Sequence, residues 1–404
     1  MAVMSVIVPA RRPTVEGRGL RTSKYGKNQG GAAVMSATED FFRVQAGRSL
    51  AKSEIVSKYF AAWANIIGAH AERIAYVDLF CGPGTYEDGA RSTPLLVLDK
   101  ACQNERVRRQ LVSLFNDSDS EIADALKANV GCFPDGRGLS HTPEFDSKKV
   151  AHGTLARYAA RLGETPTLLF LDPWGYKGLS LEEIERFIGP WGSECIFFFN
   201  YRRVNAALSN QVLSGPVTAL FGDQVASDLR RRLQDETASQ RERLGLEELR
   251  SSLTRLYGKY VLWFRLAGPD QAANYYLVHV TKGWTGYEVM RDIMDHQSSS
   301  RDAFDVSSFE YNPSGQSSMF RLAGSLPELE ESLVNDYASQ TRTAQDIFRQ
   351  HSEGRMFVRR NYRHALLRLE AAGRVKCEPG KRPSGTLAPR VRVTFMAMKE
   401  GSGG

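Results

Sequence analysis

Cysteines are few in this sequence, and they are not grouped. The 404 residues contain five cysteines and no C-x-x-C pair. Structural zinc sites and the disulfide frameworks of secreted domains both depend on clustered cysteines. The sequence therefore predicts neither a metal site nor disulfide bonds, and it favours a reducing, cytoplasmic setting.

Long apolar runs are also missing. The most apolar stretch, CIFFFN at residues 195–200, has the length of a strand, whereas a membrane-spanning helix needs roughly 20 apolar residues. The opening residues, MAVMSVIVPARRP, place the apolar run before the basic residues, which is not the order of a signal peptide. We therefore expect no membrane partner, and nothing supports secretion.

Two common phosphate-binding motifs are absent as well. No G-x-x-x-x-G-K-[ST] sequence occurs, which argues against a P-loop NTPase. The stretch DLFCGPGTY (78–86) contains Gly82 and Gly84, but the third glycine position of a G-x-G-x-x-G motif is Glu87. An acid there would repel the pyrophosphate of NAD or FAD. A dinucleotide site is therefore disfavoured.

The sequence does contain a regular alternation of short apolar strands and helical segments. This pattern predicts a doubly wound, Rossmann-like α/β sheet of about seven strands, because parallel strands covered on both faces read as nearly continuous apolar runs. The expected strands are residues 74–80, 110–117, 138–144, 167–172, 195–200, 259–267 and 274–282. A helix before the first strand places Ile55, Tyr59, Phe60, Trp63, Ile66 and Ile67 on one face.

Composition divides the chain into segments. We expect a flexible basic arm (1–36), an α/β domain (37–300) with a charged helical insertion (203–258), a linker or helical connection (301–340), a basic winged-helix-like domain (341–396) and a flexible tail (397–404). The net charge is +5 over residues 1–36 and +9 over residues 341–404, so the centre carries −7. Basic ends around an acidic body suggest contact with an anionic polymer.

The winged-helix pattern points to DNA or RNA, because the second helix of such a domain can enter a major groove. Two alternatives stay open: ordinary solvated charge, and a winged helix that binds protein. The expected nucleic-acid contacts are Arg359, Arg360, Arg363, Lys381 and Arg382.

Acidic residues follow several of the expected strands. In a doubly wound sheet, ligands bind beyond the carboxyl ends of the strands, where the strand order reverses. Asp78 ends the first strand, Asp117 follows the second, with Asp119 as a second choice, and Asp146 follows the third. Asp117 or Asp119 can hold ribose hydroxyls, although NDSDSE (116–121) can also cap the next helix. Asp78 can accept from an ammonium or a bound water, and Asp146 from the adenine amino group. A ligand with an adenosine but no phosphate, S-adenosylmethionine, fits these residues best.

The stretch TLLFLDPWGYKGLS (167–180) is the second strong signal. Asp172 ends an apolar strand, and Pro173 forces the chain out of the sheet. Trp174 and Tyr176 then offer aromatic faces on which a base could stack, beside an acid that accepts an N–H from an amine. The alternative is an aromatic loop that seals the end of the sheet.

These motifs carry a family resemblance. YVDLFCGPGTY and FLDPWGYKG, with the preceding helix AKSEIVSKYFAAWANI and the later segment GWTGYEVMRDIM, resemble the three-Cys-motif partner protein family (TcmP). That family is similar to class I S-adenosylmethionine-dependent methyltransferases. The likeness covers roughly residues 50–300 and implies that Asp78, Phe80, Gly82 and Gly84 line the cofactor, with Asp117 on the ribose.

LDPWGY is similar to the D-P-P-Y signature of amino-group methyltransferases, in which the acid holds the target nitrogen and the last aromatic ring stacks on the base. Trp174 and Gly175 replace the second proline and the aromatic residue, so the stacking ring is either Trp174 or Tyr176. The resemblance also implies a protein partner with a three-cysteine motif. The expected function is thus methyl transfer to an exocyclic amino group of a nucleic acid. The alternative is a catalytically inactive nucleic-acid-binding partner protein of a defence or mobile-element system.

Overall fold

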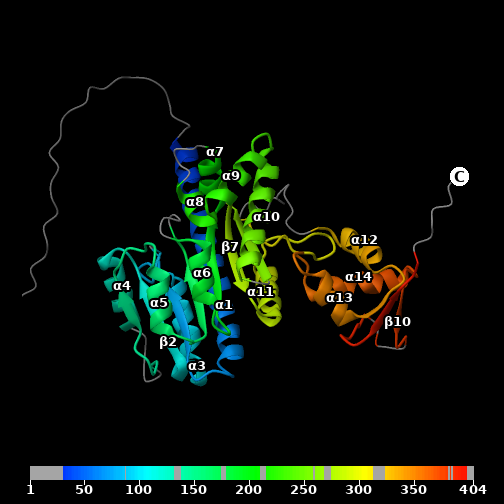
Figure 1. Cartoon of the computed structure of the whole chain (residues 1–404), viewed down its shortest axis with the longest axis horizontal. Coiled ribbons are helices and arrows are strands. Elements are labelled where there is room, and N and C mark those ends of the chain that lie inside the picture. The colour runs from blue at the N-terminus through cyan, green and yellow to red at the C-terminus, as the bar shows by residue number, and fades with distance from the viewer. Residues whose placement is uncertain are drawn as a thin grey trace, which may run out of the picture. The chain divides into compact units, whose positions relative to one another are not determined.

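The computed structural model (Figure 1) describes residues 31–86, 88–131, 138–173, 179–209, 215–257, 260–267, 274–312, 324–380, 383 and 385–397. Contacts divide the chain into two units, Met1–Phe42 and Arg43–Gly404. The first helix, α1 (Gly31–Ile67), includes the last six residues of the segment expected to be a flexible arm (1–36). Among the described residues, no helix has both the length and the apolar character needed to cross a bilayer.

An eight-stranded sheet forms the centre of the second unit. Its strands are β1 (Ile74–Asp78), β2 (Leu111–Asn116), β3 (Glu144–Asp146), β4 (Thr167–Leu171), β5 (Glu194–Asn200), β6 (Tyr260–Ala267), β7 (Asn274–Thr281) and β8 (Glu310–Tyr311). Their order is β3-β2-β1-β4-β5-β7-β6-β8, and β7 alone among them runs antiparallel to its neighbours. The doubly wound, mostly parallel fold is therefore confirmed, and the strand order reverses between β1 and β4.

Two details of the sheet differ from expectation. The third strand covers residues 144–146 and not 138–144, since only Glu144–Asp146 pair with β2. An eighth strand, β8, lies parallel to β6 through the pair Arg265 and Glu310, which form a buried ion pair. A strand of two residues leaves no periodic signal in the sequence.

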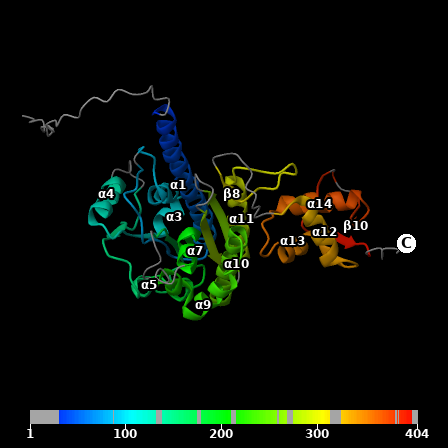
Figure 2. The ribbon, with the colours of Figure 1, turned by 90° about the horizontal axis from the view of Figure 1, so that it is seen from above.

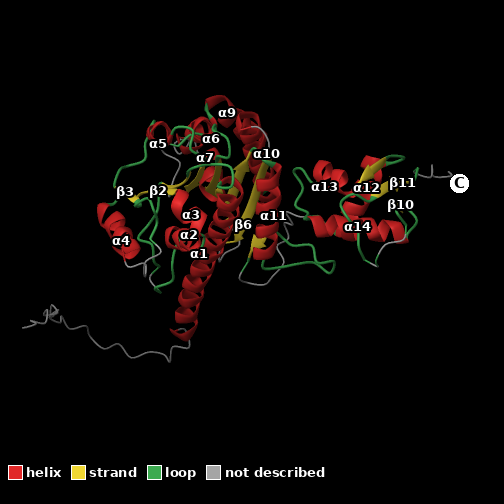
Figure 3. Ribbon diagram, turned by 90° about the horizontal axis from the view of Figure 1, so that it is seen from below, coloured by secondary structure: helices red, strands yellow, loops and turns green. Residues whose placement is uncertain are grey.

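Helices cover both faces of the sheet (Figures 2 and 3). Besides α1 they are α2 (Thr93–Cys102), α3 (Glu105–Gln110), α4 (Ser120–Gly131), α5 (Thr154–Leu162), α6 (Leu181–Ile188) and α11 (Trp284–Gln297), with α7 (Tyr201–Ser209), α8 (Gly215–Phe221), α9 (Asp223–Arg232) and α10 (Ala238–Tyr257) in the insertion. Two residues of β7 show the alternation. His279 contacts Tyr59 of α1, whereas Tyr276 donates to Glu242 of α10 on the opposite face.

Helix α1 supplies one wall of the core. Ile55, Tyr59, Phe60 and Trp63 are buried, as their three-and-four spacing predicts. Ile66, expected on the same face, is instead 37% exposed near the end of the helix. The apolar face therefore runs from the carboxyl edge of the sheet down to Trp63.

A second, smaller sheet belongs to a winged helix. The winged helix consists of α12 (Leu326–Tyr337), β9 (Thr341–Thr343), α13 (Ala344–His351), α14 (Arg359–Ala371), β10 (Val375–Glu378) and β11 (Arg392–Phe395). Its three strands form an antiparallel sheet in the order β10-β11-β9. Helix α12 lies in the stretch expected to be a connection. A capping box of Ser325 and Glu328 starts it, and it packs on α14.

Candidate active site

The loop after β1 contains a buried acid with an unused oxygen. Asp78 is 1% exposed. Its Oδ1 accepts the Phe80 N–H at 3.1 Å, whereas its Oδ2 makes no hydrogen bond of ordinary geometry among the described residues, although the Tyr76 hydroxyl lies close to this carboxyl. An unpaired buried carboxylate oxygen is costly in free energy. Such a residue at the point where the strand order reverses is a candidate ligand-binding group.

The environment of Asp78 favours its protonated form. Burial raises its pKa to about 8, and the neighbouring Asp172 carboxylate acts in the same direction. The Phe80 N–H and the Lys52 ammonium oppose this shift. A cationic group that reached Asp78 would restore the charged form, because an opposite charge at short range lowers the pKa of an acid.

The two glycines of this loop, Gly82 and Gly84, have different surroundings. Gly82 has φ of 64°, and no described atom lies within 4 Å of the place where its Cβ would be, so its backbone borders open space. Gly84 has φ of 89°, and a Cβ there would meet Leu126 Cδ1 at 2.7 Å. Gly82 is thus free to approach a ligand, whereas Gly84 permits close packing of the loop on the helices behind it.

Asp117 holds the same loop. Its Oδ2 accepts the Gly82 N–H at 3.3 Å, and its Oδ1 accepts the Asp119 N–H at 3.1 Å. The start of α4 is served by Asp119, whose Oδ1 accepts the Glu121 N–H at 2.9 Å. The sequence left open which acid caps the helix and which faces the ligand loop. In the structure, Asp119 accepts a backbone N–H at the start of α4, and Asp117 accepts one from the glycine loop.

Asp146 ends β3, next to Asp117. Its Oδ2 accepts the Tyr158 hydroxyl at 2.8 Å, and its backbone carbonyl accepts the Asp117 N–H at 3.3 Å. Burial and the Asp146 carboxylate raise the pKa of Tyr158 far above its usual range. The ends of β1, β2 and β3 thus bring Asp78, Asp117 and Asp146 to one edge of the sheet.

Asp172 lies on the other side of the reversal point, directly after β4. Its Oδ2 accepts from the Lys52 ammonium in a short contact, with the two side chains 25% and 14% exposed. Pro173 is buried behind it. Trp174 and Tyr176 lie outside the described residues, and their expected stacking role stays a prediction.

Lys52 belongs to no motif, but its position in the helix is a signal. It precedes Ile55, Val56 and Tyr59 at helical spacing, so it occupies a place on the apolar face of α1 where a hydrophobic residue is normal. Its ammonium lies 5.5 Å from the centre of the Phe198 ring. Burial lowers the pKa of Lys52, but Asp172, Tyr86 and Asp78 outweigh burial and raise it overall. Lys52 is therefore a cation held among acids.

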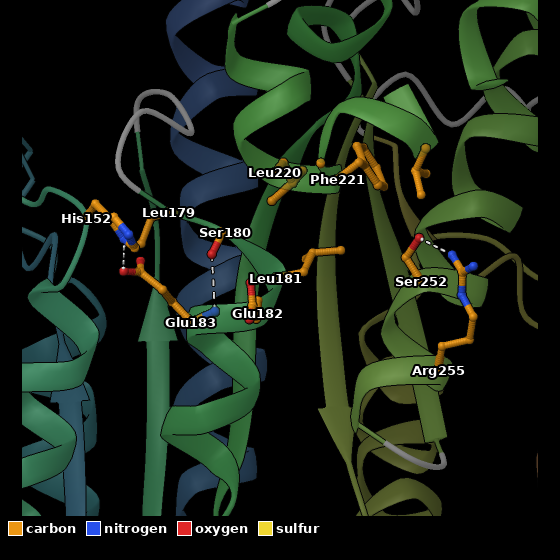
Figure 4. A pocket seen from close by; sticks show the side chains of 12 residues that line it. His152, Leu179, Ser180, Leu181, Glu182, Glu183, Leu220, Phe221, Ser252 and Arg255 are labelled. Atoms are coloured by element: carbon orange, nitrogen blue, oxygen red, sulfur yellow. Dashed lines mark hydrogen bonds and ion pairs between the residues drawn. The ribbon is translucent and has the colours of Figure 1, made fainter. Parts of the chain in front are cut away.

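A cavity of about 730 Å³ lies between the start of α6 and the helical insertion (Figure 4). Leu181, Leu220 and Phe221 form apolar walls. At its rim, His152 Nδ1 pairs with Glu183 at 2.5 Å, and Arg255 donates to Ser252 Oγ at 3.1 Å. One of its lining residues, Leu179, lies six residues after Pro173 in the chain. The cavity offers room for an apolar ring with polar contacts at the rim.

The expected nucleic-acid contacts are divided by the structure. Arg359 donates through Nε and Nη2 to Glu288 at 2.8 and 2.6 Å, and Arg360 binds Asp295 at 2.5 and 2.8 Å. Both acids lie on α11 of the same chain. Arg363 is exposed on α14. Lys381 and Arg382 lie outside the described residues. The nucleic-acid role of this set stays a prediction, with two of its arginines engaged inside the chain.

One domain of the chain matches a family. Residues 299–382 match the GMT-like wHTH domain. The match confirms a winged-helix domain at this end of the chain and includes α12. No curated protein matches the sequence.

Solved structures resemble the chain at low identity. One is LPL1258 from Legionella pneumophila str. Philadelphia 1, with 10% identity, a TM-score of 0.36, and coverage of 58% of this chain and 86% of that one. The plantazolicin methyltransferase BpumL in complex with SAH has 9% identity, a TM-score of 0.30, and coverage of 63% and 92%. A SAM-dependent methyltransferase from Methanosarcina mazei has 12% identity, a TM-score of 0.25, and coverage of 53% and 95%.

Proposed function

We propose that this protein is an S-adenosylmethionine-dependent methyltransferase that acts on an exocyclic amino group of a nucleic acid. The observation that carries the proposal is the buried Oδ2 of Asp78, which makes no ordinary hydrogen bond among the described residues, at the reversal point of the sheet and at the start of the loop that contains Gly82. The amino-acid end of S-adenosylmethionine brings an ammonium group. That group would give Asp78 the partner that it lacks among the described residues.

The neighbouring acids fit the rest of this cofactor. Asp117 can accept ribose hydroxyls in addition to the Gly82 N–H, because a carboxylate offers about four acceptor positions. Asp146 lies one strand further along and can accept from the adenine amino group. None of these contacts needs a phosphate, in agreement with the acidic character of this edge. When bound, the cofactor supplies an electrophilic methyl group.

The acceptor side of the site rests on Asp172. Its carboxylate lies across the reversal point from the glycine loop and can accept an N–H from the target amine, which orients the nitrogen lone pair toward the methyl group. The cavity lined by Leu181, Leu220 and Phe221 would offer room for the acceptor. Closure of such a site would exclude water and hold donor and acceptor in line.

The nucleic-acid part of the proposal rests on the winged-helix domain and the basic ends of the chain. One sequence observation favours a second candidate function. LDPWGY departs from D-P-P-Y at two positions, and both ends of the chain are basic, which fits a cofactor-binding protein without catalysis that serves as a nucleic-acid-binding partner.

Calorimetric titration tests the cofactor. S-adenosylhomocysteine should bind the wild-type protein with micromolar affinity, about −8 kcal/mol. Gly82→Val should abolish this binding, because its side chain would enter the open space that Gly82 borders, next to the carboxylate of Asp117. Gly89→Val is the matched control, since Gly89 also has a positive φ, of 82°, and no described atom near its Cβ position. Equal loss in both variants, or no binding by the folded wild-type protein, would refute the cofactor assignment.

Methyl transfer separates the two candidate functions. With radiolabelled S-adenosylmethionine, the wild-type protein should label DNA or RNA, and Asp172→Asn should lower the rate by about 100-fold or more while cofactor binding persists. Nucleic-acid binding should weaken as salt rises, because phosphate contacts release counterions. Salt-sensitive binding without any methyl transfer would select the inactive partner protein instead.

A further inference from the structure

The candidate site holds one pre-formed contact between its two halves, the ion pair of Lys52 and Asp172. Lys52 comes from α1, and Asp172 follows β4, 120 residues later in the chain. The charge of Asp78 also acts on Lys52, so the ammonium lies within electrostatic reach of both acids. Asp78 is the acid that lacks a cationic partner, and Asp172 is the one that has it.

The amino-acid end of S-adenosylmethionine is a zwitterion, with an ammonium and a carboxylate on one carbon. The site offers a matching pair of groups, the free oxygen of Asp78 and the ammonium of Lys52. If Lys52 turned to the cofactor carboxylate while Asp78 took the cofactor ammonium, both charges of the zwitterion would be paired and only the Asp172 carboxylate would lose its ionic partner. The exchange would thus leave the unpaired charge on a side chain that is 25% exposed and not on the buried Asp78, where an unpaired charge costs most.

We propose that Lys52 couples cofactor binding to acceptor binding: it pairs with Asp172 in the free protein and with the cofactor carboxylate in the complex, which releases Asp172 for the target amine. The inference rests on the proposed function and deepens it. Asp172 is a poorer acceptor for a neutral amine while an ammonium occupies its Oδ2, since that oxygen already accepts a charge-assisted hydrogen bond. Lys52 is thus a positioning residue, and the cofactor is expected to bind first.

Two ligands isolate the amino-acid end. S-adenosylhomocysteine carries the ammonium and the carboxylate, whereas 5′-methylthioadenosine has the same thioether and adenosine without them. Lys52→Met should weaken S-adenosylhomocysteine by about 10- to 100-fold, the effect of one hydrogen bond to a charged group. Binding of 5′-methylthioadenosine should change by less than about threefold. Lys52→Arg, which keeps the charge, should retain most of the preference for S-adenosylhomocysteine.

Lys58→Met is the control for removal of a lysine from the same helix, because Lys58 is 45% exposed and pairs with Glu54. It should bind both ligands as the wild-type protein does. Equal weakening of both ligands by Lys52→Met would overturn the inference and assign Lys52 a structural role, while the proposed cofactor would stand. Failure of the wild-type protein to bind either ligand would overturn the proposed function and the inference together.

A second measurement tests the coupling itself. A single-stranded oligonucleotide that the wild-type protein methylates should bind more tightly when S-adenosylhomocysteine is present. By linkage, S-adenosylhomocysteine should then bind more tightly, by the same factor, when the oligonucleotide is present. In Lys52→Met both enhancements should disappear, since Asp172 is then free with or without the cofactor. An enhancement of the same size in Lys52→Met would overturn the inference.

Discussion

Replacement of Asp78 by asparagine should make the protein more stable, by an amount that grows with pH. The side chain is 1% exposed, and burial raises its pKa to about 8 from an ordinary value of 3.8. An asparagine in the same place still offers an oxygen to the Phe80 N–H and carries no charge to bury. The variant therefore removes the penalty for a buried, unpaired carboxylate.

The direction of the pH effect follows from the raised pKa. Below about pH 4 the acid is protonated in both folded and unfolded chains, so the two proteins should differ little. Between about pH 4 and pH 8 the unfolded chain loses a proton that the folded chain keeps, and the wild-type protein loses stability as pH rises. The expected advantage of Asp78→Asn is about 3 kcal/mol near pH 6 and about 6 kcal/mol above pH 8.

Urea denaturation at a series of pH values measures this difference. Asp119→Asn is the control, because Asp119 is exposed and asparagine serves a helix start as well as aspartate does. Its difference from wild type should not vary with pH. A flat difference profile for Asp78→Asn would show that Asp78 is charged in the folded protein. Asp78→Asn should also bind S-adenosylhomocysteine less well. Asp78 would then be a residue that lowers the stability of the folded protein but is needed for ligand binding.

The architecture of the α/β domain was accessible from the sequence because its strands are buried on both faces. Strands β1 and β4 are apolar at nearly every position, and the acids Asp78 and Asp172 mark where each one ends. The sequence pattern puts β3 at the wrong residues and gives no sign of β8, because both short strands are fixed by pairing with a neighbouring strand. A local sequence pattern does not show how a strand aligns with a strand that is distant in the chain.

Some parts of the candidate site can likewise be predicted from the sequence, and others cannot. Glycines and acids at strand ends have a local sequence signature, and the acids at the ends of β1, β2 and β3 do meet at one edge. The partner of Asp172 could not be found by motif, because Lys52 comes from a helix 120 residues earlier. Nor could the sequence reveal that Arg359 and Arg360 bind acids of α11, since helical spacing shows which residues share a face but not what covers it.

The contact of α11 with the winged helix leads to the other large prediction. Arg291 of α11 is fully buried, and it donates to the backbone carbonyls of Ser352 at 2.8 Å and Phe357 at 3.3 Å. Its guanidinium lies 4.2 Å from the centre of the Tyr287 ring and 5.7 Å from that of Phe348. An arginine in an aromatic setting of this kind is typical of the energetically dominant residues of an interface.

Arg291→Ala should lower the free energy of unfolding by about 3–5 kcal/mol, because it removes two charge-assisted hydrogen bonds and a cation–π contact and leaves two buried carbonyls unpaired. Arg349→Ala is the matched control. Arg349 also lies over an aromatic ring of α11, 5.6 Å from the centre of Trp284, but it is exposed, so its loss should cost less than about 1 kcal/mol. Thermal unfolding of the three proteins at one pH measures both effects. If the two variants unfolded alike, the buried arginine would not be what joins α11 to the winged helix, and Arg359 and Arg360 would have to carry that contact through their ion pairs with Glu288 and Asp295.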